Sequence, residues 1–165
     1  MRSTNTLGGI LFSLLVVTSS QALADDATPG PDALFGEWRG DCDAWGTDAH
    51  CELDWESGLH TDQFTVRYAI LNANTGDGIF LGAGVYRQAE NHIDGYWSDS
   101  SDAIHPLSAS WDGAALTTHW GTVGSAQGRT VYRLNEDGSL RVIDWALSDE
   151  GWRQFMDVVY GRGAD

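Results

Sequence analysis

The strongest constraint on the fold is a short alternation of apolar and polar residues that recurs along the chain, with turn residues between the repeats. Within residues 63–71, for example, Phe64, Val66 and Tyr68 are separated by polar residues. Alternation with period two is typical of a β-strand that buries one face. No stretch shows a helical apolar stripe longer than two turns. The chain is therefore predicted to be all-β.

Ten such segments follow one another, joined by short turns rich in Gly, Asp and Asn, such as the hairpin signal Asp112-Gly113. This succession predicts an antiparallel up-and-down β-barrel of about ten strands. A sandwich of two sheets with long Greek-key connections is the alternative. The short, even loops favour the barrel, which leaves no open sheet edge. The predicted strands are residues 35–42, 51–57, 63–71, 79–87, 91–99, 104–111, 116–122, 128–134, 140–147 and 152–160.

The N-terminal residues 1–24 have the layout of a secretory signal peptide. Arg2 precedes an apolar run over residues 7–17, and the small-x-small pattern Ala22-Leu23-Ala24 fits signal peptidase. A membrane anchor is the alternative, but the run is about half of the roughly 20 residues that a spanning helix needs. We therefore expect a periplasmic or secreted protein without a membrane span in its mature chain. Residues 25–33 are expected to form a flexible lead-in, 34–162 the barrel and 163–165 a tail.

The charge balance limits the classes of partner. The chain contains 24 acidic residues, nine arginines and no lysine, for a formal net charge of −15. Nucleic acids and anionic membrane surfaces both attract positively charged proteins. Neither is expected as a partner.

The two cysteines, Cys42 and Cys51, lie close together in the sequence. In the predicted first hairpin they fall on the same side of adjacent strands. In an exported protein this favours a disulfide bond, with free thiols or a Cys–His metal site as alternatives.

Two groups of short motifs resemble known families. Gly36-Glu37-Trp38-Arg39-Gly40 resembles the Gly-x-Trp-x-Gly opening strand of calycin barrels, which include the lipocalin, fatty-acid-binding and nitrobindin-type proteins. Residues 84–87, 96–100, 111–113 and 158–162 resemble the bacterial DUF1579 family of lipocalin-like barrels. The resemblance implies a barrel with an interior pocket for a small apolar or amphipathic molecule.

The resemblance also implies a structural role for Trp38. In calycins the opening Trp packs under a late Arg at the barrel floor, and Arg162 or Arg133 would match that Arg here. Nitrobindin-type barrels hold haem through a His near the C-terminal end, whereas the last histidine here is His119. Haem held in that manner is not expected, and no other cofactor is indicated.

Strand alternation also predicts which side chains face the interior. Arg129 or Arg133 would face inward in one register of strand 128–134 and could bind a ligand carboxylate, and both face solvent in the other. His105 is in step with Leu107, and is either a pocket group or a hydrogen-bonded core residue. Ile143 is expected inward beside Trp145. The predicted pocket residues are Trp55, Phe64, Tyr68, Trp97, His105, Trp111, Arg129, Tyr132 and Trp145.

Motifs for chemistry are weak. No Gly-x-Ser-x-Gly elbow and no closely spaced histidine pair occur, so neither a hydrolase of that type nor a zinc site is indicated. The acidic residues, such as Glu52, Asp54 and Glu56, mostly alternate onto polar strand faces. The leading interpretation is a barrel that binds a small apolar or amphipathic ligand. The alternatives are a small isomerase, cyclase or hydratase that uses an inward His, Tyr or Asp, and a packed barrel that acts through its surface.

Overall fold

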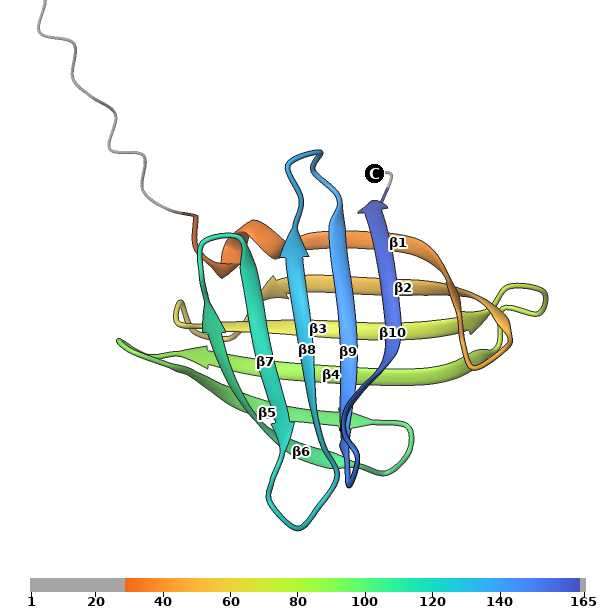
Figure 1. Cartoon of the computed structure of the whole chain (residues 1–165). Helices are drawn as coiled ribbons and strands as arrows, with labels where there is room; N and C mark the ends of the chain where they lie inside the picture. The colour runs from red at the N-terminus through yellow and green to blue at the C-terminus, as the bar shows by residue number, and fades with distance from the viewer. Residues whose placement is uncertain (1–28, 164–165) are drawn as a thin grey trace, which may run out of the picture.

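The computed structural model describes residues 29–163, which form a closed antiparallel β-barrel (Figure 1). Each strand pairs with its neighbours in the sequence, and β10 returns to pair with β1. The prediction of an all-β, ten-stranded, up-and-down barrel is confirmed. The predicted signal peptide lies outside the described residues. The elements are η1 (Pro31–Leu34), β1 (Gly36–Asp43), β2 (Asp48–Ser57), β3 (Gln63–Asn72), β4 (Gly78–Gln88), β5 (Ile93–Asp99), β6 (Ile104–Trp111), β7 (Ala115–Gly121), β8 (Gln127–Leu134), β9 (Leu140–Ser148) and β10 (Gly151–Arg162).

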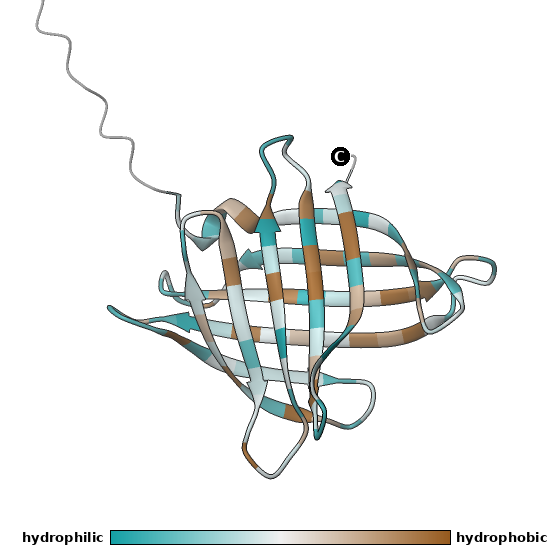
Figure 2. Ribbon diagram, viewed as in Figure 1, coloured by the Kyte–Doolittle hydropathy of each residue, from teal (hydrophilic) through white to brown (hydrophobic). Residues whose placement is uncertain are grey.

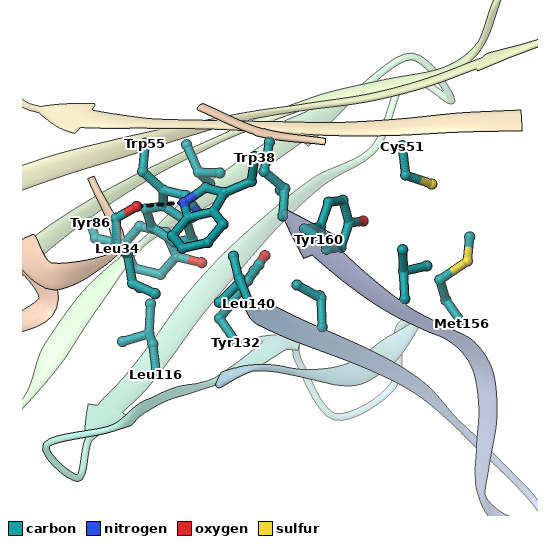
Figure 3. Close-up of a cluster of buried hydrophobic side chains, with 14 of the residues drawn as sticks. Leu34, Trp38, Cys51, Trp55, Tyr86, Leu116, Tyr132, Leu140, Met156 and Tyr160 are labelled. Atoms are coloured by element: carbon teal, nitrogen blue, oxygen red, sulfur yellow. Dashed lines mark hydrogen bonds between the residues drawn. The ribbon is translucent and has the colours of Figure 1, made fainter. Parts of the chain in front are cut away.

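The barrel has one end closed by the start of the chain. The single-turn 3-10 helix η1 begins at Pro31, whose ring fixes a backbone angle suited to a helix start. Leu34 is fully buried, and its carbonyl accepts a 2.7 Å hydrogen bond from the indole nitrogen of Trp38 (Figure 3). Part of the predicted flexible lead-in is thus an ordered plug, because Pro31 and Leu34 bury apolar surface against the core.

The disulfide bond Cys42–Cys51 joins β1 to β2 and confirms the predicted pairing. In the register of these strands Cys51 lies opposite Gly40 and Cys42 opposite Ala49, so the two cysteines are diagonal neighbours. Cys51 is fully buried and its sulfur lies 3.8 Å from the hydroxyl of Tyr68. The bond therefore joins β1 to β2 on the interior side of their hairpin.

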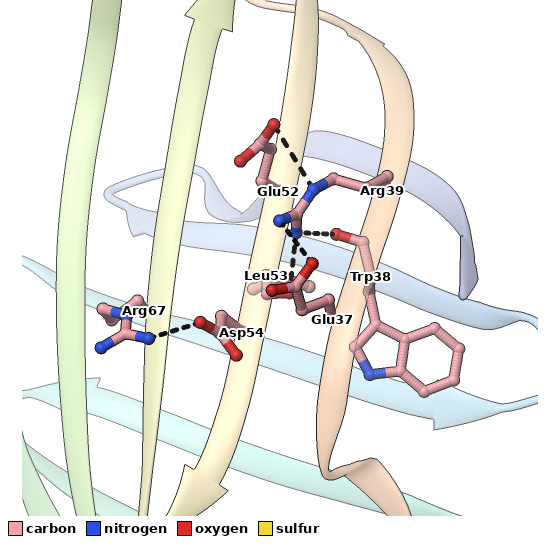
Figure 4. Close-up of polar contacts among 7 residues, drawn as sticks. All are labelled: Glu37, Trp38, Arg39, Glu52, Leu53, Asp54 and Arg67. Atoms are coloured by element: carbon pink, nitrogen blue, oxygen red, sulfur yellow. Dashed lines mark hydrogen bonds and ion pairs between the residues drawn. The ribbon is translucent and has the colours of Figure 1, made fainter. Parts of the chain in front are cut away.

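Hydropathy bands alternate along the strands (Figure 2), and the outer face of β1–β3 holds ion pairs. Arg39 lies between Glu37 and Glu52, and Arg67 contacts Asp54, while Trp38 points to the opposite side of β1 (Figure 4). Such exposed pairs contribute little stability, about 0–1 kcal/mol each. These acidic residues lie on the outer surface, as the alternation predicted, and do not enter the interior.

None of the helices in residues 29–163 has the length and hydrophobicity required to cross a bilayer.

Candidate functional site

The barrel interior contains a cavity of about 440 Å³ with a mainly apolar lining that is rich in aromatic side chains. Ligand pockets for small molecules have volumes of roughly 300–1,000 Å³, so the cavity can hold one small organic molecule. Its wall comes from both halves of the barrel. The aromatic residues that line it are Trp45, Tyr68, Phe80, Tyr86, Trp97, His105, Trp120, Tyr132 and Phe155.

Glycines on neighbouring strands keep this space open. The indole of Trp97 on β5 lies against Gly82 on β4, where an added Cβ would come within 2.1 Å of the ring. Trp120 on β7 lies in the same way against Gly128 on β8, with a corresponding distance of 1.8 Å. The two indoles therefore lie close to the barrel wall, because no Cβ pushes them toward the centre.

A row of three polar side chains crosses the apolar wall on adjacent strands. Thr118 on β7 pairs with Thr130 on β8, which pairs in turn with Asp144 on β9. All three are buried and line the cavity. The hydroxyl of Thr130 donates a 2.5 Å hydrogen bond to Oδ1 of Asp144, and the hydroxyls of Thr118 and Tyr86 lie 3.3 Å apart. We call Thr118, Thr130 and Asp144 the polar row.

Asp144 is the electrostatic centre of the site. Its residue surface is only 7 % exposed. Burial raises the pKa of its carboxyl group to about 6, and the hydrogen bond from Thr130 offsets only part of that effect. Among residues 29–163, Thr130 is the only side chain that hydrogen-bonds or pairs with this carboxyl group. Asp144 is thus an acidic group with one oxygen atom left for a ligand or for water.

Tyr68, Tyr86 and Tyr132 line the same cavity as this carboxyl group and remain neutral. Burial raises the pKa of Tyr86 to about 12 and that of Tyr132 well above its ordinary value. The negative charge of Asp144 adds to the rise at both residues, and at Tyr68. These hydroxyl groups can donate or accept hydrogen bonds near Asp144 but do not supply a charge.

The cavity opens between loops at the end of the barrel away from η1. Trp45, in the loop closed by the disulfide, lines the cavity although it is 62 % exposed. Asp99 accepts hydrogen bonds from the indole of Trp97 and from the amide and hydroxyl of Ser101. Burial raises the pKa of Asp99, but these hydrogen bonds outweigh burial and lower it overall. Asp99 is therefore a satisfied carboxylate at the mouth, unlike Asp144.

Four of the predicted pocket residues line the cavity, namely Tyr68, Trp97, His105 and Tyr132. The imidazole of His105 lies 5.3 Å from the ring of Trp120. Trp55, Phe64 and Trp111 occupy the interior or its closed end and do not line the cavity. The ring centroid of Trp55 lies 6.0 Å from that of Phe64 and 5.0 Å from that of Tyr132, in the core nearer η1. The indole of Trp111 donates a 2.6 Å hydrogen bond to the carbonyl of Pro29.

The prediction that Arg129 and Trp145 line the pocket is wrong. They face each other across β8 and β9 on the outer surface, where the guanidinium group lies 4.3 Å from the Trp145 ring centroid. Trp152 adds a second ring at 5.4 Å. Arg133 is also outside and lies 3.6 Å from Asp112. An arginine in the pocket, and the ligand carboxylate it would have bound, are therefore not part of this site.

The residues of β9 that were predicted to face inward are one position away from those that do. Val142 and Asp144 face the cavity, whereas Ile143 and Trp145 face outward. Tyr132 lies opposite Val142, so the inward side chain of one strand meets that of the next. Both alternations of β9 contain apolar residues, and the strand alone does not choose between them.

At the closed end, the structure brings Trp38 and Arg162 together. The guanidinium group lies 3.9 Å from the Trp38 ring centroid and donates hydrogen bonds to the carbonyls of Phe35 and Ala33. These contacts join the last strand to η1 and to the start of β1. These contacts lie at the closed end of the barrel, and neither Trp38 nor Arg162 lines the cavity.

The prediction from the sequence missed the polar row. The signal that could have found Thr118 is its position between Leu116 and Trp120 in the apolar phase of β7. Thr130 has the same position before Tyr132 on β8. Asp144 follows Leu140 and Val142 in the buried phase of β9. A polar residue in the buried phase of each of three consecutive strands indicates an interior polar site.

Within residues 29–163, no group of three or more His, Cys, Asp or Glu side chains is placed to hold a metal ion.

No protein-family model and no curated protein matches the sequence. A search of solved structures finds similarity to the crystal structure of Rv2717c from M. tuberculosis. The two chains are 14 % identical with a TM-score of 0.58, over 80 % of this chain and 94 % of the other. At this identity the similarity supports the barrel fold alone.

Proposed function

We propose that the protein binds one small, largely apolar molecule inside its barrel. The observation that carries this proposal is the aromatic cavity of about 440 Å³ with a polar row on one wall. Apolar and aromatic walls with a few convergent polar groups are typical of ligand pockets. Trp97 and Trp120 lie against glycines, and this arrangement supports a space kept open for a ligand rather than a core filled with side chains.

A second candidate is a small barrel enzyme, which the environment of Asp144 favours. A carboxyl group with a pKa near 6 inside a pocket is suited to general acid–base catalysis near neutral pH. His105 is a second titratable group in the lining. The two candidates differ in one observable. An enzyme converts the molecule it captures, and Asp144→Asn would stop conversion while the molecule still binds.

The proposal includes export and kinship with calycin-like barrels, of the DUF1579 or nitrobindin type. The apolar run at residues 7–17 and the Cys42–Cys51 disulfide support a periplasmic or secreted location. The opening Trp38 under Arg162 supports the calycin resemblance. Sequencing the N-terminus of the mature protein tests export, with Asp25 as the expected first residue.

The direct test is native mass spectrometry and absorbance spectroscopy of the mature protein purified from its own host. We expect a stoichiometric mass above that of the polypeptide with its disulfide, and fragmentation then identifies the class of molecule. A bare mass combined with failure to bind any added apolar probe would contradict the proposal.

Two matched variants locate the bound molecule. Val142 is 1 % exposed and lines the cavity, whereas the adjacent Ile143 faces outward. We expect Val142→Phe to weaken binding of a neutral probe, 2-naphthylmethanol, by at least about tenfold. Ile143→Phe adds similar bulk outside and should leave the affinity unchanged. Equal effects of the two variants would place the probe elsewhere. Thermal melting establishes that both variants are folded.

A further inference from the structure

Carboxyl groups outnumber basic groups in the lining of the cavity. Asp144 and Asp99 supply two carboxyl groups and His105 one imidazole. Among the residues that the structure describes, no arginine lines the cavity, and the chain contains no lysine. The formal net charge of −15 adds a field of the same sign. An anionic ligand such as a fatty acid would therefore find no permanently positive side chain in this lining.

The two carboxyl groups differ in how many of their oxygen atoms already accept a hydrogen bond. Both oxygens of Asp99 already accept hydrogen bonds from Trp97 and Ser101. Asp144 is more than nine-tenths buried and accepts one hydrogen bond, from Thr130 to Oδ1. No donor among residues 29–163 is hydrogen-bonded to its Oδ2 atom. A buried carboxylate is costly unless a cation or several donors surround it, so Asp144 is a binding group without its partner.

The surrounding rings also suit a positive charge. Tyr68, Tyr86 and Tyr132 line the same cavity as Asp144. The face of an aromatic ring attracts ammonium groups, and the attraction strengthens when water is excluded. A carboxylate among aromatic rings is therefore chemically matched to a protonated amine.

From this geometry, and resting on the proposed function, we infer that the barrel selects an organic amine whose protonated nitrogen pairs with Asp144 while its apolar body fills the aromatic cavity. The amine donates an N–H hydrogen bond to Oδ2 of Asp144. Thr130 holds the carboxylate through Oδ1, and is a positioning residue. Trp97 and Trp120 flank the remaining volume, which selects a flat or compact apolar group.

Three probes of one shape test the charge preference. They are 2-naphthylmethylamine, a cation at pH 7.5, 2-naphthylmethanol, which is neutral, and 2-naphthoate, an anion. Isothermal titration calorimetry should show the amine binding at least about tenfold more tightly than the alcohol, because a charge-assisted hydrogen bond contributes more than a neutral one. The anion should bind more weakly than the alcohol.

Asp144→Asn identifies the group responsible. This variant keeps the shape and an acceptor for Thr130 but removes the charge, so the preference for amine over alcohol should fall to within about threefold. The affinity for the alcohol should persist, which also shows that the variant is folded. Glu90→Gln removes one exposed negative charge and should retain the full preference.

The outcomes separate the two proposals. If the alcohol binds but the amine has no advantage, or if the advantage survives Asp144→Asn, the inference about the amine is wrong and the binding function stands. If none of the three probes binds up to about 1 mM, the inference about the amine is overturned. If the native mass is also that of the bare polypeptide, the binding function is overturned with it.

Discussion

The guanidinium group of Arg162 lies 3.9 Å from the ring centroid of Trp38, so the last residue of β10 covers the fully buried indole of β1. The same group hydrogen-bonds the carbonyls of Phe35 and Ala33 beside η1. Only two residue pairs, Trp38–Arg162 and Arg39–Gly161, register β1 against β10. The side chain of Arg162 therefore supplements a short stretch of backbone pairing where the barrel closes.

Replacing Arg162 by Ala should lower the free energy of unfolding by about 1–3 kcal/mol, since it removes a cation–π contact and two hydrogen bonds from a charged donor. Arg162→Lys should recover only part of the loss, because an ammonium group lacks the planar fork of a guanidinium. Urea unfolding measures both variants. An unfolding free energy for Arg162→Ala within about 0.5 kcal/mol of the original would show that the backbone pairing closes the barrel without it.

Asp144 should make the stability depend on pH between about 4 and 6. Its carboxyl pKa is about 6 in the folded protein and 3.8 as its ordinary value. The folded state therefore binds more protons in this window, and the free energy of unfolding falls as the pH rises through it, by about 3 kcal/mol in total. Asp144→Asn lacks this loss, so it should match the original protein near pH 4 and exceed its stability above pH 6.

Urea unfolding of both proteins between pH 4 and pH 8 checks this prediction. The carboxylates of Asp99, Asp112 and Asp157 have lowered pKa values and act in the opposite direction at lower pH. They are common to both proteins, so the difference between the two curves isolates Asp144. Parallel curves would contradict the raised pKa.

The disulfide should stabilise the fold through its short loop. Cys42 and Cys51 are nine residues apart, and closing a loop of this length stabilises by about 2–3 kcal/mol. We therefore expect a reducing agent to lower the melting temperature of the protein. A Cys42→Ala/Cys51→Ala double variant should melt at the lower temperature with or without reductant. A reductant effect on the double variant would show that the shift has another cause.

Gly82→Ala should narrow the cavity. Its new Cβ would lie 2.1 Å from the Trp97 indole, so the ring must move away from the wall. We expect weaker binding of 2-naphthylmethanol, by about tenfold, and an overpacking cost of about 1–3 kcal/mol in stability. Gly161→Ala is the matched control, since nothing lies within 4 Å of its added Cβ. Calorimetry and urea unfolding measure the two effects, and unchanged binding by Gly82→Ala would show that Trp97 does not shape the occupied space.

The sequence alone determined the elements of the fold. Alternation and turn residues placed all ten strands to within a few residues, because each strand carries its own period and each turn its own chemistry. The disulfide followed from the same alternation, which set Cys42 and Cys51 on one side of neighbouring strands. Both features depend on residues that are near one another in the chain.

The tertiary structure decided which side chains face the barrel interior. On β9, Leu140 and Val142 offer one apolar phase and Ile143 and Trp145 another, so the strand is compatible with either face inward. Pairing with β8 set Val142 beside Tyr132 and left Trp145 outside, under Arg129. The phases of β8 and β9 together put Arg129 outside and Asp144 inside, so we expect a positively charged ligand in place of a carboxylate. The phase of a strand depends on its partners around the closed barrel, which no single segment of sequence encodes.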